Sequence, residues 1–433
     1  MERYQEYKDS GIYFIGTMPS HWKQLRAKYL FKQEKRSVRP QDDIITCFRD
    51  GQVTLRKNRR VDGFTNSEKE IGYQGIRVND LVIHNMDAFA GAIGISDADG
   101  KSTPVYAVCT PRANCVNVYY YCYLLRSLAR DGLILSLAKG IRERSTDFRF
   151  SDFKELVLPI PTTEEQEKIV NYIDRSAVQI DKAIAQQQRM IDLLNERKQI
   201  IIQHAVTKGL DPNAEMVDSG VEWIGEMPKG WSVYKLKHIC NAFGRIGFRG
   251  YSTSDLVEEN EGAITLSPSN MKDGGMTYEK CTYLSWKKYE ESSEIKIHDG
   301  DIIFVKTGSS YGKSSIVYGL PKEATINPQL LVFKDIRCSR EFLSYVLMTN
   351  SIRNQIETSV IGGTIPTISQ NKILNFSFTC PSKGEQENIV CKLGELINPI
   401  KSSIKKIEKR ISFLRERKQI IINEVVTGKV KVS

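Results

Sequence analysis

One stretch of fourteen residues occurs twice and decides the architecture. Residues 9–22 read DSGIYFIGTMPSHW, and residues 218–231 read DSGVEWIGEMPKGW. Eight of the fourteen positions are identical, at an offset of 218 − 9 = 209 residues. Self-similarity at a fixed spacing is typical of repeated architectures, but this spacing is several times longer than a solenoid repeat. The pattern indicates a tandem duplication of one large module.

A second pair of matching segments lies further along each copy. The letters EQE at 165–167 return at 385–387, and ERKQIII at 196–202 returns at 416–422. Both matches have an offset of 220 residues, so the stretch between them contains no insertion. The ends of the two copies are therefore alike, while their middles differ. A duplicated chain whose copies pack face to face has approximate two-fold symmetry, and it can meet two similar partners or two half-sites.

The end of each copy has the pattern of a long amphipathic helix. Apolar residues recur there at alternating spacings of four and three, which is typical of a coiled-coil seam. Thr163 with Gln166 fits a capping box at the start of the first helix, and Gly209 and Gly428 are expected to end the two helices. The predicted seam residues are Ile173, Ile180, Ile184, Ile191 and Leu194 in the first copy, and Leu393, Ile397, Ile404, Ile411 and Leu414 in the second.

The two predicted helices match each other in length. Each has about 40 residues and is therefore about 60 Å long at 1.5 Å per residue. A helix with one apolar stripe needs a surface to pack against. The equal stripes favour an antiparallel pair of helices, which would hold the two middles at opposite ends. Packing of each helix on its own globular domain is the alternative.

The two middles, residues 23–158 and 232–378, predict a mixed α/β fold. Short β-type runs are separated by Gly, Asn and Asp, and amphipathic helices are expected at 119–130 and 340–349. We therefore expect two copies of an α/β (α+β) domain, separated by two long helices in an antiparallel coiled coil. The expected boundaries are 1–158 for the first domain, 159–210 for the first helix, 211–378 for the second domain and 379–433 for the second helix.

The composition limits the classes of protein and of site. The chain has 433 residues, a formal net charge of +10 and a pI near 9.0, which fits a nucleic-acid binder although charge alone is weak evidence. Nine scattered cysteines without a C-x-x-C pair, and only five histidines, argue against a metal site and favour free thiols in a reducing cytosol. No apolar run approaches the roughly 18 residues of a membrane-spanning helix, so no membrane partner is expected.

Each middle carries basic loops that are candidates for DNA contact. Arg, Lys, Ser and Tyr side chains on loops can reach phosphates or base edges, and glycine lets the backbone approach closely. A solvated surface loop is the alternative for any single run, but recurrence in both copies favours binding. The candidate DNA-binding residues are Arg56, Lys57, Arg59, Arg60, Arg142 and Arg144 in the first copy, and Arg245, Arg249, Tyr251, Lys306, Ser309, Tyr311 and Lys313 in the second.

The sequence contains no recognisable catalytic motif. The run from Gly308 to Ser314 resembles a P-loop, but it is one residue too short, and Thr307 stands where the first glycine belongs. Motifs for adenine methyl transfer, dinucleotide binding, zinc-dependent hydrolysis and serine hydrolysis are also missing. Two divergent middles without shared chemical residues favour two recognition tasks. We expect no catalytic residues, no metal and no cofactor on this chain.

Taken in order along the chain, these motifs resemble the specificity subunit of type I restriction–modification systems. The resemblance rests on Trp22 and Trp231 after Met-Pro, on the Pro-Ile-Pro run at 159–161 before Glu-Gln, and on the two Glu-Arg-Lys runs. Residues 79–83 and 300–303 are also similar to the family's recurring Gly-Asp-hydrophobic strand, although Asn79 replaces the glycine in the first copy. The match covers essentially the whole chain.

The resemblance implies two target-recognition domains, each reading one half of a bipartite sequence in double-stranded DNA. It implies that methylation subunits, two of them, dock on the helices and that restriction subunits join through this complex. S-adenosylmethionine, ATP and Mg²⁺ are then expected on the partner subunits, and the chain is expected in the cytoplasm of a bacterium or archaeon. A coiled-coil protein-interaction scaffold without specific DNA readout is the alternative, and a stand-alone nucleic-acid enzyme is the other rival.

Overall fold

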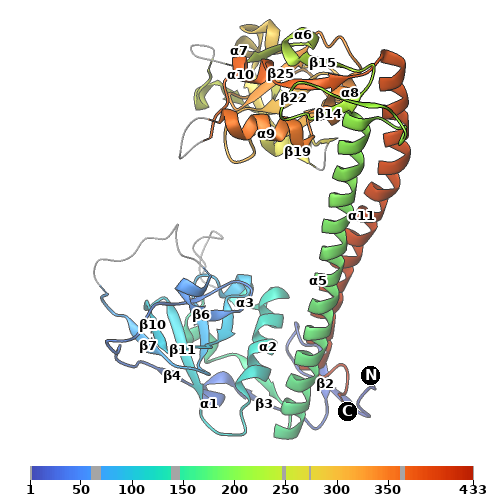
Figure 1. Ribbon diagram of the computed structural model, residues 1–433. Helices are drawn as coiled ribbons and strands as arrows, with labels where there is room; N and C mark the ends of the chain where they lie inside the picture. Colours follow the sequence, from blue (N-terminus) through green and yellow to red (C-terminus); the bar gives the residue numbers. More distant parts are fainter. Residues whose placement is uncertain are drawn as a thin grey trace. The chain divides into compact units, whose positions relative to one another are not determined.

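The chain forms two compact units, which we describe separately. One unit consists of Met1–Gln188 with Glu408–Ser433, and the other of Arg189–Ile407. Each unit contains one duplicated middle and part of each long helix, α5 (Thr163–Lys208) and α11 (Lys383–Val426) (Figure 1). The units thus divide both helices, and the consecutive domain boundaries expected from the sequence stay a prediction. The computed structural model describes residues 2–59, 70–137, 147–245, 250–272, 275–360 and 366–432.

A four-stranded antiparallel sheet of order β4-β11-β8-β9 forms the centre of the first unit. Successive residues of a strand point to opposite faces. Leu81 and Ile83 accordingly face the core shared with the helices, while Val82 and Val108 face a second cluster beneath two small sheets, β5-β6 and β7-β10. These strands are β4 (Phe31–Glu34), β5 (Ile45–Cys47), β6 (Val53–Leu55), β7 (Gln74–Ile76), β8 (Leu81–His84), β9 (Ile93–Ile95), β10 (Gly100–Ser102) and β11 (Tyr106–Pro111).

Helix α2 (Val118–Arg130) packs against β9 of this sheet and confirms the amphipathic helix expected there. Its Tyr120 is fully buried and meets Trp22 edge to face. The Tyr120 hydroxyl donates a hydrogen bond of 2.9 Å to the carbonyl of Val426, so the last turn of α11 completes this core. The other elements are β1 (Tyr7–Asp9), β2 (Thr17–Pro19), β3 (Lys23–Arg26), α1 (Ala27–Leu30), η1 (Arg56–Asn58), η2 (Ala88–Ala90), α3 (Leu133–Leu137), α4 (Phe150–Phe153) and β12 (Val157–Ile160).

The second unit repeats this plan and adds a larger second sheet. In its central sheet, of order β16-β25-β22-β23, Ile302 and Phe304 pack with the helices. Ile303 and Val305 pack instead on the second sheet, β17-β21-β18-β24, in which β18 and β24 are parallel. The strands of the two sheets are β16 (Asn241–Gly244), β17 (Leu256–Val257), β18 (Gly262–Leu266), β21 (Thr282–Ser285), β22 (Ile302–Val305), β23 (Ser314–Ile316), β24 (Ala324–Ile326) and β25 (Leu330–Lys334).

The remaining elements of the second unit frame these sheets. The helix expected at 340–349 is α8, which is shorter than predicted because Thr349 caps a new helix, α9. These elements are β13 (Met216–Asp218), β14 (Glu226–Pro228), β15 (Ser232–Lys235), α6 (Leu236–Ile239), η5 (Thr253–Asp255), η6 (Pro268–Asn270), β19 (Met271–Lys272), β20 (Gly275–Met276), α7 (Trp286–Glu290), η7 (Ser293–Ile295), α8 (Arg340–Val346), α9 (Asn350–Ser359), α10 (Gln370–Leu374) and β26 (Ser377–Cys380).

The long helices run antiparallel within each unit (Figure 1). In the first unit, Nζ of Lys418 lies 2.7 Å from Oδ2 of Asp181. In the second unit, Ile202 shares a core cluster with Leu393 and Ile397. The predicted seam residues are buried at Ile173, Ile191, Leu393, Ile397 and Ile411, and half-buried at Ile180, Ile184, Leu194, Ile404 and Leu414.

The helix ends confirm one prediction and correct another. Gly209 and Gly428 follow the helix ends with φ of 74°, a left-handed conformation that glycine adopts without strain. The capping box at the start of α5 lies one residue earlier than predicted. The Thr162 hydroxyl accepts from the N–H of Glu165 at 3.2 Å, and the Glu165 carboxylate accepts from the N–H of Thr162 at 3.0 Å. Among the described residues, no helix is long and apolar enough to cross a membrane.

Candidate nucleic-acid interface

The residue that follows β8 in the first unit has a well-defined backbone environment. The N–H of Asn85 donates to the carbonyl of Val105, the residue just before β11, at 2.9 Å. The carbonyl of Asn85 accepts from the N–H of Phe148, also at 2.9 Å. These two bonds fix Asn85 at the end of the central sheet where β8 ends and β11 begins.

The residue that follows β22 in the second unit makes the same two bonds. The N–H of Lys306 donates to the carbonyl of Gln329, just before β25, at 2.9 Å. The carbonyl of Lys306 accepts from the N–H of Ile368 at 2.9 Å. Asn85 and Lys306 therefore occupy equivalent positions in the duplicated fold, although their side chains differ in charge and in hydrogen-bonding capacity.

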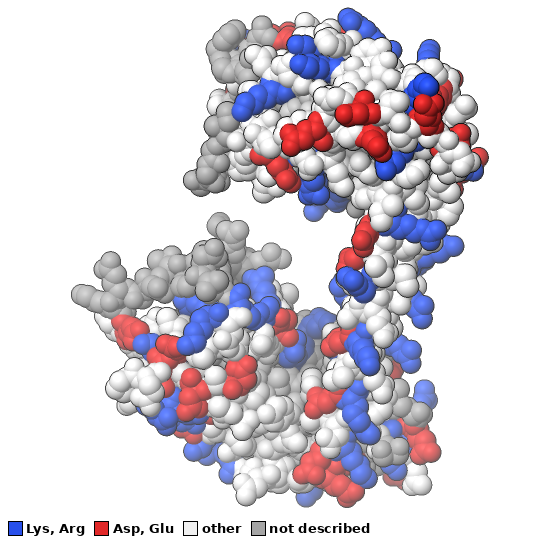
Figure 2. All heavy atoms as spheres, in the orientation of Figure 1, with Lys and Arg blue, Asp and Glu red and all other residues white. Residues whose placement is uncertain are grey.

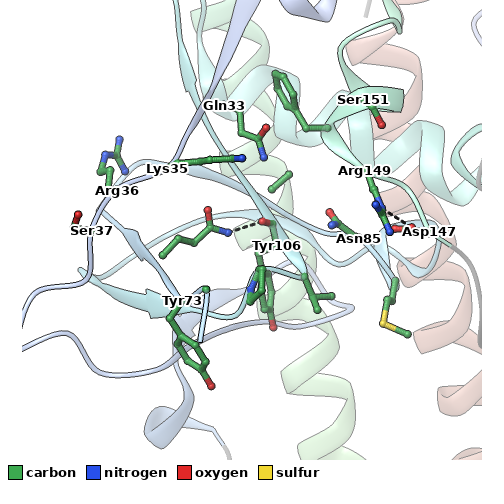
Figure 3. A pocket seen from close by; sticks show the side chains of 17 residues that line it. Gln33, Lys35, Arg36, Ser37, Tyr73, Asn85, Tyr106, Asp147, Arg149 and Ser151 are labelled. Atoms are coloured by element: carbon green, nitrogen blue, oxygen red, sulfur yellow. Dashed lines mark hydrogen bonds and ion pairs between the residues drawn. The ribbon is translucent and has the colours of Figure 1, made fainter. Parts of the chain in front are cut away.

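In the first unit, this end of the sheet opens into a cavity of about 930 Å³ (Figure 3). The loop after β4, the loop before β7 and the start of α4 form its walls. Its polar character suits a ligand that offers many hydrogen-bonding groups, as the grooves of DNA do. The polar lining residues are Gln33, Lys35, Arg36, Ser37, Tyr73, Gln74, Asn85, Tyr106, Asp147, Arg149 and Ser151.

Three side chains give this cavity its chemistry. Lys35 is exposed and, within the described part of the chain, has no acidic partner; it extends toward Gln33 and Asn85 in Figure 3. The Nε of Arg149 donates to Asp147 at 2.6 Å. The side-chain amide of Asn85 makes no hydrogen bond to the described residues, and its Oδ1 is shielded from water. The cavity thus combines an unpaired ammonium group with an amide that the fold does not use.

The second unit presents the loop from Lys306 to Lys313, which joins β22 to β23, at the corresponding end of its sheet. This loop brings together four predicted residues, Lys306, Ser309, Tyr311 and Lys313. Ser309 is exposed, Tyr311 is half-buried against the core beside the helices, and Nζ of Lys313 donates to the carbonyl of Met271. A strand, not a helix, follows the loop, which agrees with the exclusion of a P-loop.

Lys306 is the basic residue of this loop that directly follows β22. Its side chain is half-buried, and burial lowers the pKa of its ammonium group. No acidic side chain of the described residues pairs with it. An ammonium group that is partly withdrawn from water without a partner is poised to bind an acceptor-rich ligand.

Arg245 is positioned differently from the prediction. It is only 2% exposed, and its guanidinium donates to the carbonyl of Ile326 and to the hydroxyl of Thr325, both at 3.0 Å. The half-buried Tyr251 ring lies 5.6 Å from its Cζ. Because its donors point into the fold, Arg245 supports the sheet end, and we remove it from the proposed DNA contacts.

The equivalent arginine in the first unit also points inward. Arg36 corresponds to Arg245 at the offset of 209 residues, and its guanidinium forms a two-pronged ion pair with Asp80. This hydrogen bond raises the pKa of Arg36. In both domains an arginine shortly after the first strand of the central sheet, β4 or β16, thus points inward.

The basic run of the first copy lies around the short helix η1. Lys57 pairs with Asp43 at 2.6 Å, and Arg59 pairs with Asp50 at 2.7 Å. The Nε of Arg56 donates to the hydroxyl of Thr46 at 3.3 Å. These residues are not part of the cavity at the sheet end, and their roles in DNA contact stay a prediction. Arg60, Arg142, Arg144 and Arg249 lie outside the described residues.

The chain is similar to known proteins along most of its length. Residues 228–412 match the family model of the type I restriction modification DNA specificity domain. The MjaVIII specificity subunit of Methanocaldococcus jannaschii, a type I restriction enzyme subunit, is 25% identical over 316 residues, which cover 72% of this chain and 70% of that protein. The MjaIX specificity subunit of the same organism is 21% identical over 324 residues, which cover 74% and 71%.

A solved structure from work on complex assembly and conformational transition of the type I R-M system has the same fold. It matches with a TM-score of 0.66 and 16% identity over 95% of this chain and 99% of that chain. Residues 228–412 therefore contain a type I restriction modification DNA specificity domain, and the chain is similar to curated type I specificity subunits over about three quarters of its length.

The long helices α5 and α11 carry exposed apolar residues at duplicated positions. Leu193 and Ile200 of α5 are 44% and 62% exposed, and Phe413 and Ile420 of α11, 220 residues later, are 56% and 48% exposed. Single exposed apolar residues need no explanation, but apolar residues conserved between the two copies on a solvent-facing surface suit protein contact. Lys and Arg side chains also cover much of the visible helix surface in Figure 2.

Sequence reasoning missed Gln33, Lys35, Asn85 and Arg149 of the cavity. These residues do not form a basic run, so a search for clusters of Lys and Arg passes over them. The aligned strands at 79–83 and 300–303, at an offset of 221, do contain the signal. Carrying that offset two residues further pairs Asn85 with the predicted Lys306.

Proposed function

We propose that this chain is a specificity subunit that recognises a bipartite sequence in double-stranded DNA, with each domain binding one half-site through its sheet end. The supporting observation is that the two equivalent sheet ends carry different polar residues, an amide at Asn85 and an ammonium group at Lys306. If both positions contact DNA, the amide and the ammonium group would recognise different bases, because each base pair presents its own pattern of donors and acceptors in the major groove.

A domain exchange tests this assignment. Residues 23–158 are replaced by the corresponding domain of another specificity subunit, and the methylated adenines are mapped in a host that contains the methylation subunits. One half of the recognised sequence should change while the other stays the same. A change in both halves, or in neither, would contradict modular recognition.

We also propose that two methylation subunits dock on the helices, one on each copy of the exposed apolar pair. Each unit contains one such pair, Leu193 with Ile200 in the second unit and Phe413 with Ile420 in the first. Restriction subunits would join through this core, and S-adenosylmethionine, ATP and Mg²⁺ would bind to these partner subunits.

Single charge substitutions test this stoichiometry. Leu193→Glu should remove one methylation subunit from the purified complex, Phe413→Glu should remove the other, and the double variant should remove both, as counted by native mass spectrometry. Gln199→Glu, at an exposed polar position of the same helix, is the control and should leave the complex intact. Loss of both subunits from either single variant would argue against two independent docking surfaces.

The helices would finally set the gap between the half-sites. Four residues inserted at Gln187 would lengthen α5 by about 6 Å and approximate one step of the four-three seam. Because DNA rises about 3.4 Å per base pair, the preferred gap should grow by about two base pairs while both half-sites keep their sequences. An unchanged gap with lowered stability would show that the helices do not act as the ruler.

A further inference from the structure

We propose that residues 85 and 306 are the equivalent base-reading positions of the two domains, with Asn85 selecting adenine in the first half-site and Lys306 selecting guanine in the second. This inference rests on the proposed function, because it assigns single base contacts within two domains that read DNA.

The first argument is geometric. The same two backbone hydrogen bonds, all at 2.9 Å, fix Asn85 and Lys306 at the same end of the same sheet. Their side chains therefore start from equivalent places in the two domains. A base pair presented to both domains in the same way would meet an amide in one case and an ammonium group in the other.

The second argument is that the fold makes no use of the Asn85 amide. It forms no hydrogen bond with any described residue, and its shielded Oδ1 is an acceptor without a donor at the wall of the cavity. A polar group left unsatisfied in this way calls for a ligand or another explanation. An amide offers a donor and an acceptor side by side, which is the pattern that pairs with N6 and N7 of adenine in the major groove.

The third argument is that the lysine at the sheet end comes from a different sequence position in each domain. At the offset of 209, Lys35 of the first domain corresponds to Gly244 of the second. Nζ of Lys306 lies 3.4 Å from the point where a Cβ at Gly244 would be, so the lysine occupies the space beside that glycine. The ammonium group stays at the sheet end but comes from another strand, and residue 306 itself carries no amide. An ammonium group only donates, which suits O6 and N7 of guanine.

Burial separates this assignment from simple phosphate contact. Lysines that track phosphates are commonly held out in solvent, whereas Lys306 lies half-buried against the end of β16. In the first domain the exposed Lys35 is available for a phosphate, beside Asn85 at the base edge. Each sheet end can thus place one residue at a base.

The test uses the full chain assembled with the methylation subunits of its own host. The complex selects from a library of random-sequence DNA duplexes, and the bound duplexes are sequenced for the wild type, Asn85→Lys and Lys306→Asn. Asn85→Lys should change one base pair of the first half-site from A·T to G·C, with roughly a tenfold change in preference. Lys306→Asn should make the reverse change at one position of the second half-site.

Asn114→Lys is the matched control. It adds the same charge at an exposed position beyond the opposite end of β11, so it should leave both half-sites unchanged. If Asn85→Lys does not assemble, Lys306→Asn still tests the equivalence from the other domain.

Two outcomes would overturn the inference, and they differ from failure of the proposed function. If both half-sites keep their sequences and only the salt dependence of binding changes, residues 85 and 306 contact phosphates or nothing, while bipartite recognition stands. If the altered base pair lies in the wrong half-site, the equivalence is wrong. If the wild-type complex selects no bipartite sequence at all, the proposed function itself fails.

Discussion

The indole Nε1 of Trp231 donates a hydrogen bond to Oε1 of Glu385 at 3.0 Å, and the equivalent atoms of Trp22 and Glu165 lie 3.3 Å apart. The tryptophan ends the duplicated head of each copy, and the glutamate opens the duplicated helix. The two stretches that repeat most clearly in the sequence are thus the two halves of one contact. This explains why the two stretches repeat with different offsets. The contact requires only that the tryptophan and the glutamate meet, so the number of residues between them can differ between the copies.

Removing this contact should destabilise the unit that contains it. Trp22 is fully buried, and a hydrogen bond to a charged group contributes about 1.5–3 kcal/mol. Trp22→Phe should therefore lower the free energy of unfolding by about 2 kcal/mol, measured by denaturant titration. Trp286→Phe is the control, because Trp286 is exposed and its loss should cost less than about 0.5 kcal/mol. Equal effects of the two substitutions would argue against a structural role for the indole–carboxylate bond.

The sequence predicts the helical part of the fold well. The four-three pattern places Ile173 and Ile397 correctly in buried positions, and the glycines at 209 and 428 end the helices as expected. The capping box is shifted by one residue because Gln166 has another role. Its Oε1 accepts from the N–H of Asn117 at 2.9 Å and so joins α5 to the start of α2. Such a contact between distant segments leaves no local signal.

The candidate interface is less accessible from the sequence. Composition favours residues such as Arg245, whose charge the fold uses internally. It passes over Asn85, which is neutral and becomes notable only once its backbone bonds match those of Lys306. Which charged residue points inward depends on tertiary packing, and local charge patterns do not encode it. The duplication supplies the missing information, since each residue of one domain can be compared with the residue at the equivalent position of the other.

The inward ion pair of the first domain should contribute to stability. Asp80 is buried, accepts two bonds from Arg36, and accepts the N–H of Arg77 at 2.7 Å. Asp80→Asn should cost about 2 kcal/mol, less than the roughly 3–5 kcal/mol of a fully buried pair, because Arg36 retains contact with water and the amide keeps one acceptor. Thermal unfolding should show this loss, whereas Glu164→Gln, in an exposed pair with Lys168, should have almost no effect.

The residue before this aspartate explains a departure from the family pattern. Asn79 has φ of 69°, and the equivalent Gly300 has φ of 90°. Both positions need the left-handed region, which glycine adopts freely and asparagine tolerates better than other residues. The recurring glycine is thus a requirement of the turn that leads into β8 and β22.

Two substitutions at this position isolate the backbone effect. Asn79→Gly and Asn79→Ala both lose the 2.8 Å bond from the Tyr119 hydroxyl, so they differ only in conformational preference. Asn79→Gly should be more stable than Asn79→Ala by about 1 kcal/mol, because alanine is strained at positive φ. Denaturant midpoints of the two variants provide the comparison, and equal midpoints would show that the turn relaxes without cost.

The cysteines offer a test of the packing of both units at once. The chain has nine free cysteines, of which only Cys115 and Cys391 are exposed. The thiolate is the reactive form, and burial raises the pKa of the Cys240 thiol and of the Cys338 thiol to about 12. At pH 8 both thiols are protonated, and their side chains are buried at Cys240 and half-buried at Cys338. An alkylating reagent should therefore modify two cysteines rapidly in the native chain and all nine after denaturation.

Mass spectrometry of peptides after a short pulse of reagent identifies the modified sites. Cys115 follows β11 in the first unit and Cys391 lies on α11 in the second, so each unit provides one reactive thiol. Serine at both positions should abolish the rapid phase and leave the slow phase unchanged. Rapid modification of Cys109 or Cys380, which are buried beside the central core of their units, would show that those cores open on the timescale of the pulse.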